Sequence, residues 1–296
     1  MNRTAIATVR RFNRVAGERI GALRSDFLGL RRPIGEARLL WEVGEHGADI
    51  RDLRARLDLD SGYASRLLRS LEDDGLVTVA ADAHDARVRR VTLTARGKRE
   101  WRELEARSDA LAGSVLQPLN ERQRSELVAA MATVERLLTA SMIETRIVSP
   151  RSADARFCIA QYFAELNDRF DAGFDPAQSI PADAAQLTLP NGLFLVARLR
   201  GRPVGCGAMK LPRAKPAYIK RMWVSRDLRG VGLGRRLLRE LEDLASEHGA
   251  TVVQLETNRT LTEAIALYRA SGYREVKPFN DEPYAHHWFE KRVTGP

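Results

Sequence analysis

A glycine-rich segment is the part of this sequence whose residues point most directly to chemistry. It is Arg-Gly-Val-Gly-Leu-Gly over residues 229–234. Glycine tolerates positive φ and has no side chain, so successive backbone N–H groups of such a turn can converge on an anion. The N-terminus of a following helix favours the same negative charge. The segment therefore predicts a phosphate-binding loop.

The flanking residues predict the elements that must position this loop. Residues 217–224 are rich in β-branched and aromatic side chains, which favours a strand. Residues 235–245 repeat leucine at helical spacing, which favours a helix. The loop is thus expected between the end of a strand and the start of a helix.

The glycine spacing excludes two common nucleotide motifs. No Gly-Lys-Ser/Thr follows, as a P-loop requires, and the glycines alternate instead of following G-x-G-x-x-G. An ordinary glycine-rich turn remains the alternative. The pattern Arg-x-x-Gly-x-Gly after a strand resembles the pyrophosphate loop of the GNAT acetyltransferases, and this resemblance implies acetyl-CoA as cosubstrate.

A second block strengthens the resemblance. Residues 251–257 favour a strand, and Thr260-x-x-Glu263 is a capping-box pattern for a following helix. That helix is expected to end at Gly272, a plausible left-handed cap. Residues 264–273, Ala-Ile-Ala-Leu-Tyr-Arg-Ala-Ser-Gly-Tyr, are similar to the second conserved block of the same family. The resemblance covers about residues 153–292.

The family resemblance implies roles for individual residues. Tyr268 would be the acid beside the CoA sulfur, although a core aromatic with a satisfied hydroxyl is the plainer interpretation. Relatives often carry a glutamate base on the strand before the loop, where this chain has Tyr218 after Ala217. Glu256 is therefore one candidate base and a solvent relay is another. The expected cofactor-binding residues are Met222, Trp223, Val224, Arg229, Gly230, Val231, Gly232, Leu233, Gly234, Arg235, Asn258 and Tyr268.

The amine acceptor needs a pocket of its own. Candidates that could line it are Glu165, Arg169, Phe174 and Tyr284. The pair His286-His287 lacks a Cys or third ligand at metal spacing, so no metal site is expected.

The first half of the chain predicts a different module. Short helical patterns follow one another, and the helix that begins at Asp60-Ser61 places leucines on one face and polar residues on the other. A helix-turn-helix with outward Ser and Arg suits contact with phosphates and base edges. Simple solvation of an exposed face is the alternative. The candidate DNA-binding residues on this helix are Ser61, Tyr63, Ser65, Arg66 and Arg69.

A predicted β-hairpin follows, with basic residues at and beyond its tip. This layout, with Leu-Glu-Asp-Asp-Gly-Leu-Val at 71–77, resembles the winged helix of the MarR family. By that resemblance Arg87 is the wing arginine that reaches the minor groove, and Arg89 is a further DNA contact. Residues 98–143 predict one or two long helices broken near Pro118. Relatives dimerise through such terminal helices, which implies a homodimer on a roughly palindromic double-stranded DNA site.

Composition is consistent with a two-domain, DNA-binding chain. Its length of 296 residues is typical of two domains. Its 48 Lys plus Arg residues against 39 Asp plus Glu give a net charge of +9, which favours a polyanion partner. No stretch suggests a membrane span or secretory signal, so a cytoplasmic location without a membrane partner is expected. Cys158 and Cys206 lie in apolar segments and are expected to be small buried hydrophobes.

The sequence thus predicts an α+β protein of two domains. Residues 1–145 form a mostly helical winged helix-turn-helix with dimerisation helices, residues 146–152 a short junction, and residues 153–296 a mixed α/β acyltransferase sheet. The predicted function is a DNA-binding regulator that also transfers acetyl from acetyl-CoA to a small-molecule or peptide amine. Alternatives are a regulator whose second domain only senses acyl-CoA, and a protein acetyltransferase whose helix-turn-helix only scaffolds assembly.

Overall fold

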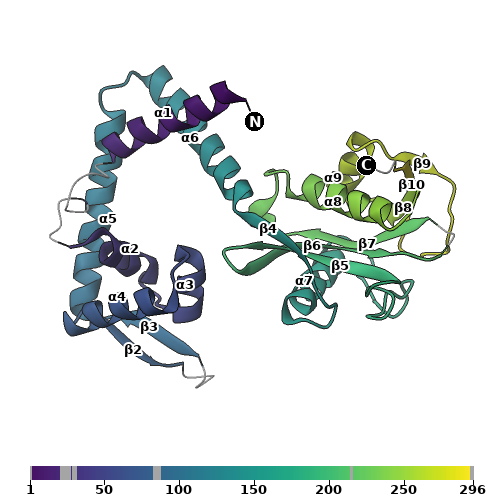
Figure 1. Ribbon diagram of the computed structural model, residues 1–296, viewed down its shortest axis with the longest axis horizontal. Coiled ribbons are helices and arrows are strands. Elements are labelled where there is room, and N and C mark those ends of the chain that lie inside the picture. The colour runs from purple at the N-terminus through teal and green to yellow at the C-terminus, as the bar shows by residue number, and fades with distance from the viewer. Residues whose placement is uncertain (1, 21–27, 29–31, 83–87, 214–215, 294–296) are drawn as a thin grey trace. The chain divides into compact units, whose positions relative to one another are not determined.

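A computed structural model of the chain describes residues 2–20, 28, 32–82, 88–213 and 216–293. The chain divides into two compact units, Met1–Thr133 and Val134–Pro296. Figure 1 labels the elements of both units. Among the helices that the structure describes, none has the length and apolar content to cross a membrane.

The first unit is mostly helical and carries one small sheet. Its strand order is β1-β3-β2, in which β2 and β3 form an antiparallel hairpin and β1 pairs with β3. This is the expected winged helix arrangement. The elements are α1 (Arg3–Arg19), α2 (Ile34–Val43), β1 (Ala48–Asp49), α3 (Ile50–Leu57), α4 (Ser61–Asp73), β2 (Val77–Ala81), β3 (Arg89–Leu93) and α5 (Ala95–Leu116), followed by α6 (Glu121–Ser141), which runs across the division between the units.

Side-chain caps fix the starts of α3 and α4. The Asp49 carboxylate accepts hydrogen bonds from the backbone N–H groups of Arg51 and Asp52, and Asp60 accepts one from Tyr63. The predicted inward face of α4 is confirmed, because Ala64, Leu67, Leu68 and Leu71 are all buried. Its opposite face is therefore free to meet a partner.

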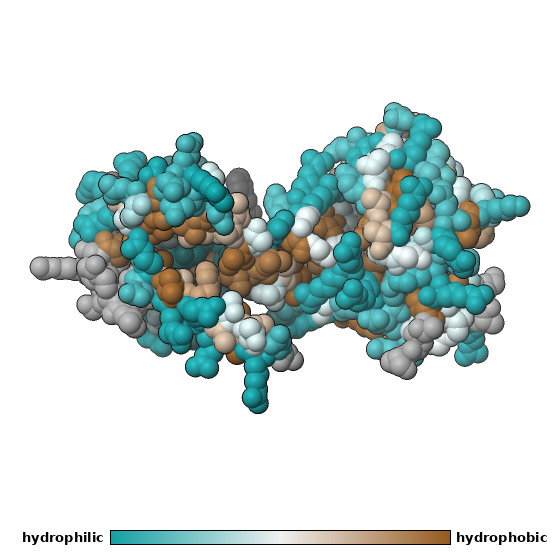
Figure 2. Space-filling model, turned by 90° about the horizontal axis from the view of Figure 1, so that it is seen from above, coloured by the Kyte–Doolittle hydropathy of each residue, from teal (hydrophilic) through white to brown (hydrophobic). Residues whose placement is uncertain are grey.

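The helices at both ends of the first module leave apolar side chains exposed. The predicted break near Pro118 is confirmed, since α5 ends at Leu116 and α6 begins at Glu121. Neither α1 nor α6 has a buried residue within the described chain, although both carry large apolar side chains. Figure 2 shows brown apolar side chains among the teal polar ones on the face that it draws.

The second unit is built on a seven-stranded mixed sheet of order β4-β5-β6-β7-β8-β10-β9. Only the β7–β8 pair is parallel among the described pairings. Its elements are β4 (Ile143–Ile147), α7 (Ala153–Arg169), β5 (Gly192–Leu199), β6 (Arg202–Lys210), β7 (Ala217–Val224), the short 3-10 helix η2 (Arg226–Leu228), α8 (Leu233–Glu247), β8 (Val252–Thr257), α9 (Thr262–Ala270), β9 (Arg274–Val276) and β10 (His287–Arg292).

Helices cover both faces of this sheet. In Figure 1, α7 lies on one face and α8 and α9 lie on the other. One core cluster gathers leucines of α8 with inward residues of β5 to β8, and a second gathers Ala155 and Cys158 of α7 with Phe194 and Trp223. Both cysteines are buried and free, as predicted.

Two details differ from the sequence expectations. Residues 143–147, expected to close the first domain and open the junction, form β4, which pairs with β5 at the edge of the second sheet. The second unit therefore begins before residue 146. The predicted capping box is also wrong, because α9 begins at Thr262 and the Glu263 carboxylate accepts a hydrogen bond from Arg169 instead.

Candidate functional site

The candidate site lies where two neighbouring strands of the sheet separate. β7 and β8 pair in parallel only at their starts, Ala217 with Val253 and Tyr218 with Gln254, among the pairings that the structure describes. Towards their carboxyl ends the two strands diverge. The carboxyl ends of parallel strands are where open α/β sheets place ligand sites.

A β-bulge in β7 contributes to this separation. Between the pairs Cys206–Trp223 and Ala208–Lys220, β6 has one residue and β7 has two. The first of these two β7 residues is Arg221, whose φ is 56°. A bulge bends its strand and leaves a residue outside the ladder. β7 therefore turns away from β8 at this point.

Two cavities occupy the opening. The larger has a volume of about 520 Å³ and reaches the glycine loop, and the smaller has a volume of about 210 Å³ and lies against the β8 side. They meet at six residues that line both: Tyr162, Leu166, Met222, Leu261, Ala264 and Tyr268. A ligand in one cavity can thus reach a ligand in the other.

Tyr268 lies at this meeting point. Its ring packs against Tyr273 and Phe289, with ring centroids 5.9 and 5.7 Å away, and only 6% of the residue is exposed. Burial, and after it the negative charge of Glu256, raise the pKa of the Tyr268 hydroxyl above its ordinary value. The hydroxyl therefore stays protonated at neutral pH.

The glycine loop has the predicted geometry. Gly230 and Gly232 have φ of 78° and 85°, and a Cβ built on either would meet no described atom within 4 Å. Gly232 is the N-cap of α8 and brings no side chain to its free N–H groups. The larger cavity is lined by Gly230, Gly232, Leu233, Gly234 and Arg235 of this segment, whereas Val231 packs on the hydrophobic core.

Arg229 is held by a carboxylate at the rim of the larger cavity. Its guanidinium lies 2.6 Å from Glu165 Oε2. Arg169 also pairs with Glu165, at 3.3 Å, and with Glu263, at 2.7 Å. Glu165 and Arg169 line the larger cavity and not the smaller one, so the structure places these two acceptor candidates in the cavity that reaches the glycine loop.

Asn258 is buried and its side chain is engaged within the protein. Its Nδ2 donates to the Tyr284 carbonyl at 2.7 Å, and its Oδ1 accepts from the Thr260 N–H at 2.9 Å. It lines the smaller cavity and not the larger. These contacts show that Asn258 orders the loop after β8. The remaining predicted cofactor residues of β7, Met222, Trp223 and Val224, line the larger cavity.

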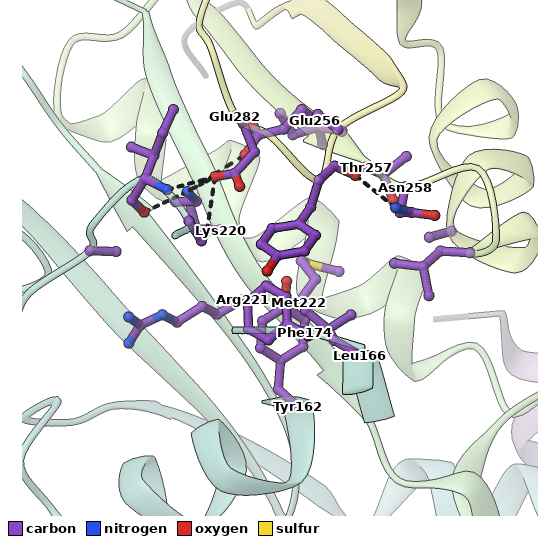
Figure 3. A pocket seen from close by; sticks show the side chains of 18 of the residues that line it. Tyr162, Leu166, Phe174, Lys220, Arg221, Met222, Glu256, Thr257, Asn258 and Glu282 are labelled. Atoms are coloured by element: carbon purple, nitrogen blue, oxygen red, sulfur yellow. Dashed lines mark hydrogen bonds and ion pairs between the residues drawn. The ribbon is translucent and has the colours of Figure 1, made fainter. Parts of the chain in front are cut away.

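Glu256 belongs to a buried charged cluster in the smaller cavity (Figure 3). Lys220 Nζ lies 3.6 Å from Glu256 Oε1 and 3.2 Å from Glu282 Oε2. Burial raises the pKa of Glu256; the Lys220 charge and the Tyr218 hydroxyl oppose that shift without cancelling it. A carboxylate whose pKa is raised towards neutrality is better suited to accept a proton.

Aromatic rings line the wall of the smaller cavity. Phe174 and Tyr284, both predicted, have ring centroids 4.8 Å apart. Phe163 lies 5.4 Å from Phe174, and Phe170 lies 5.6 Å from Tyr284. The structure thus brings these two acceptor candidates together and adds two rings that the sequence analysis did not single out.

Three charged residues of the smaller cavity were also missed. Lys220, Arg221 and Glu282 line it, although a charged residue in a strand or loop is more often on the surface. One signal in the sequence could have found the bulge. Apolar residues of β7 alternate at Ala217 and Ile219, and then resume at Met222, one position later than a regular strand allows.

The candidate DNA-binding residues of α4 form one exposed face. Ser61, Tyr63, Ser65, Arg66 and Arg69 are all exposed. Arg66 lies over the Tyr63 ring, 5.7 Å from its centroid. Arg89 is exposed on β3, and Arg87 lies outside the described residues. In the part of the chain that the structure describes, no group of three or more His, Cys, Asp or Glu is arranged to hold a metal ion.

Comparison with known proteins places this geometry in a family. Residues 160–273 match the model of the acetyltransferase (GNAT) family. An IAA acetyltransferase of Azospirillum brasilense is 38% identical over 137 residues, 45% of this chain and 87% of that protein. The chain belongs to the GNAT acetyltransferase family. N-alpha-acetyltransferase RimI of Mycobacterium tuberculosis is 34% identical to the GNAT region over 142 residues, 47% of this chain and 84% of that protein.

Two further matches are a solved structure and a second family model. A crystal structure of a GNAT acetyltransferase from Staphylococcus aureus covers 51% of this chain and 100% of its own, with 17% identity and a TM-score of 0.44. Residues 28–88 match the model of the MarR family. The chain therefore joins a MarR-family domain to a GNAT acetyltransferase domain, which confirms both predicted resemblances.

Proposed function

We propose that the GNAT domain transfers an acetyl group from acetyl-CoA to a primary amine. The observation that carries this proposal is the meeting of two cavities at Tyr268 in the opening between β7 and β8. The larger cavity would take the cosubstrate and the smaller the acceptor. Direct transfer requires the two ligands to touch, and the six shared residues mark where they would do so.

The larger cavity fits the phosphate end of CoA. The loop offers glycines with open space above them and the uncapped N-terminus of α8, both suited to an anion. Arg229 and Arg235 add positive charge at its rim. In this proposal Arg229 releases Glu165 when a pyrophosphate binds, and Glu165 keeps Arg169 as its partner.

The residues at the junction have separable tasks. Bound acetyl-CoA supplies an acyl group activated as a thioester. The backbone N–H groups around the bulge at Met222 are positioned to stabilise negative charge on the acyl oxygen. Glu256 accepts a proton from the amine, directly or through water, and Tyr268 donates its proton to the departing sulfur. An N–C bond forms as the C–S bond breaks, so charge and protons balance.

Thioester cleavage tests the enzyme. Purified protein, acetyl-CoA and a broad panel of amines should release free thiol with at least one amine, above the rate without amine. No turnover across the panel would favour the alternative, a regulator whose GNAT domain only senses acyl-CoA. Under that alternative acetyl-CoA would still bind and still change DNA affinity.

We also infer that the MarR-family domain binds double-stranded DNA as a homodimer. The exposed Ser and Arg side chains of α4 support a contact in the major groove, and exposed apolar side chains of α1 and α6 support self-association. Two-fold symmetry implies a pseudo-palindromic site. A gel-shift selection from a genomic DNA library tests this inference. The protein should shift one DNA sequence specifically, and substitutions on α4 should abolish that shift.

A further inference from the structure

Two buried carboxylates lie together in the smaller cavity. Glu256 of β8 and Glu282 of the loop before β10 both line it, and their side chains are only 7% and 6% exposed. Lys220 is shared between them, so the cluster keeps an excess of one negative charge when all three groups are charged. An excess charge away from water needs a partner of opposite charge. This part of the cavity is therefore suited to a cation.

Each of the two carboxylates has an oxygen that is left without a donor. Glu282 Oε2 accepts hydrogen bonds from Ser179 Oγ and the Ile180 N–H, both at 2.9 Å, and from Lys220 at 3.2 Å. Glu282 Oε1 and Glu256 Oε2 are buried and have no hydrogen-bond partner among the described residues. A buried charged acceptor without a donor is costly. A primary ammonium carries three N–H donors and one positive charge, so a single such group would satisfy both oxygens.

Much of the cavity wall is aromatic. Six of the residues that line it are Tyr162, Phe163, Phe170, Phe174, Tyr268 and Tyr284. Four of these, Phe163, Phe174, Phe170 and Tyr284, form a continuous series of ring contacts with centroid distances of 4.8 to 5.8 Å. Such a wall favours a flat ring. A volume of about 210 Å³ is below that of typical drug-sized sites, which favours a small molecule.

Arg221 brings a positive charge to another edge of the cavity. Its guanidinium lies over the Phe163 ring, 5.4 Å from the ring centre. Figure 3 shows Glu256 and Glu282 on one side of the cavity and the Arg221 side chain reaching a separate edge. Because like charges repel, an ammonium is disfavoured beside Arg221 and favoured beside the carboxylates. The two charged edges thus give a bound amine one orientation.

We propose that the smaller cavity selects small primary amines joined to an aromatic ring by a short alkyl chain, with the ammonium on Glu256 and Glu282 and the ring against Phe174 and Tyr284. An α-carboxylate is excluded, because it would share a carbon with the ammonium and lie beside two carboxylates. The proposal rests on the proposed acetyl transfer only in naming this cavity as the acceptor site.

Four compounds of similar size test the selection. Phenylethylamine has the amine and the ring, phenylethanol replaces the amine by a neutral hydroxyl, cyclohexylethylamine replaces the flat ring by a puckered one, and phenylalanine adds a carboxylate. Each is titrated calorimetrically into the full chain, with and without coenzyme A, and each amine is assayed for acetylation.

Phenylethylamine should bind most tightly of the four. Phenylethanol should bind roughly 10- to 100-fold more weakly, the usual effect of losing a charge-assisted hydrogen bond. Cyclohexylethylamine should bind roughly 2- to 10-fold more weakly, since ring–ring contacts are worth that factor. Phenylalanine should bind at least about tenfold more weakly, because its carboxylate meets like charges.

Two variants locate the amine and the ring. Glu282→Gln can keep an oxygen for Ser179 and Ile180 but replaces the free oxygen by an NH₂ group, so it should weaken phenylethylamine at least about tenfold and leave phenylethanol unchanged. Phe174→Leu should bring phenylethylamine and cyclohexylethylamine within about twofold of each other and keep the preference for amine over alcohol. Glu247→Gln is the matched control, since Glu247 is exposed on α8 and lines neither cavity.

The outcomes separate this proposal from the enzyme activity. Phenylethylamine binding that depends on Glu282, without any acetylation, would support the site and contradict the transfer. Acetylation of phenylalanine as fast as phenylethylamine, or equal binding of phenylethylamine and phenylethanol, would overturn the selection and leave the transfer standing. Failure of all four compounds to bind or react would overturn the proposal outright.

Discussion

At the scale of single residues, the GNAT domain places a tyrosine hydroxyl, Tyr268, where its two cavities meet and a buried carboxylate, Glu256, in the smaller cavity. The Tyr268 hydroxyl is protonated at neutral pH, and burial raises its pKa further; burial also raises the pKa of Glu256, which makes its carboxylate a better proton acceptor. These two residues should separate in their kinetic effects.

Tyr268→Phe should lower kcat by about 10²- to 10⁴-fold, the usual contribution of general acid catalysis. The ring remains, so acetyl-CoA binding measured by calorimetry should stay within experimental error. Tyr273→Phe is the matched control, because Tyr273 has a buried hydroxyl in the same aromatic cluster but lines neither cavity. Equal rates for Tyr268→Phe and the wild type would remove the hydroxyl from the mechanism.

Glu256→Gln should cost activity and yet stabilise the fold at alkaline pH. Burial raises the pKa of Glu256 in the folded state above the ordinary 4.5, so the folded chain binds this proton more tightly than the unfolded chain. Unfolding free energy is then lost as pH rises through the raised pKa and is unaffected below 4.5. Lys220 keeps its contact with Glu282 in the variant.

Unfolding in urea at pH 4 and pH 8 measures this difference. The variant should match the wild type at pH 4 and exceed it at pH 8. The acid limb of kcat/KM, which reports a base in the free enzyme, should disappear in the variant. A variant that is less stable than the wild type at pH 8 would contradict the assignment.

At the scale of elements, the sequence predicted the features that depend on neighbouring residues, such as helix faces and helix ends. The inward face of α4 and the break at Pro118 followed from 3.6-residue repeats and from proline chemistry. The ion pair between Lys220 and Glu282 could not be predicted in this way, because the fold brings together two residues that are far apart in the chain. Glu165 and Arg169 were predicted to line the acceptor pocket, and only the direction of α7 decides that they line the larger cavity instead.

The glycine loop offers a test at this scale. Gly232→Ala introduces a Cβ at φ of 85° with no described atom within 4 Å, so its cost in unfolding free energy should be about 1–2 kcal/mol of backbone strain. The same Cβ would stand where the proposed pyrophosphate approaches, so the Kd for acetyl-CoA should rise at least tenfold. Gly272→Ala has the same φ and open space but lines neither cavity, and should lose stability alone. Equal CoA affinity in both variants would remove the loop from cofactor binding.

At the scale of the whole molecule, two domains of different chemistry share one basic chain. The net charge of +9 supports general attraction to DNA, whereas sequence preference has to come from particular side chains. Arg66→Ala on the exposed face of α4 should weaken binding to a selected site by about 1–3 kcal/mol and random duplex much less. Arg122→Ala, on the exposed surface of α6, should weaken both alike and only slightly. Gel shifts over a salt series distinguish these results, and equal losses for both variants would reduce α4 to a general basic surface.

Dimerisation is expected to matter for DNA binding and not for acetyl transfer. Val9 and Phe12 of α1 are 57% and 47% exposed in one chain, so a partner is expected to cover them. The double variant Val9→Asp with Phe12→Asp should sediment as a monomer and lose binding to a palindromic site, which needs two recognition helices. Its kcat per chain should stay unchanged, because residues of the GNAT domain alone line both cavities.

Leu189→Asp is the control variant. It alters an apolar residue of the GNAT domain that is 47% exposed, and the variant should remain dimeric. A wild type that sediments as a monomer, or a double variant that stays dimeric, would place the interface elsewhere.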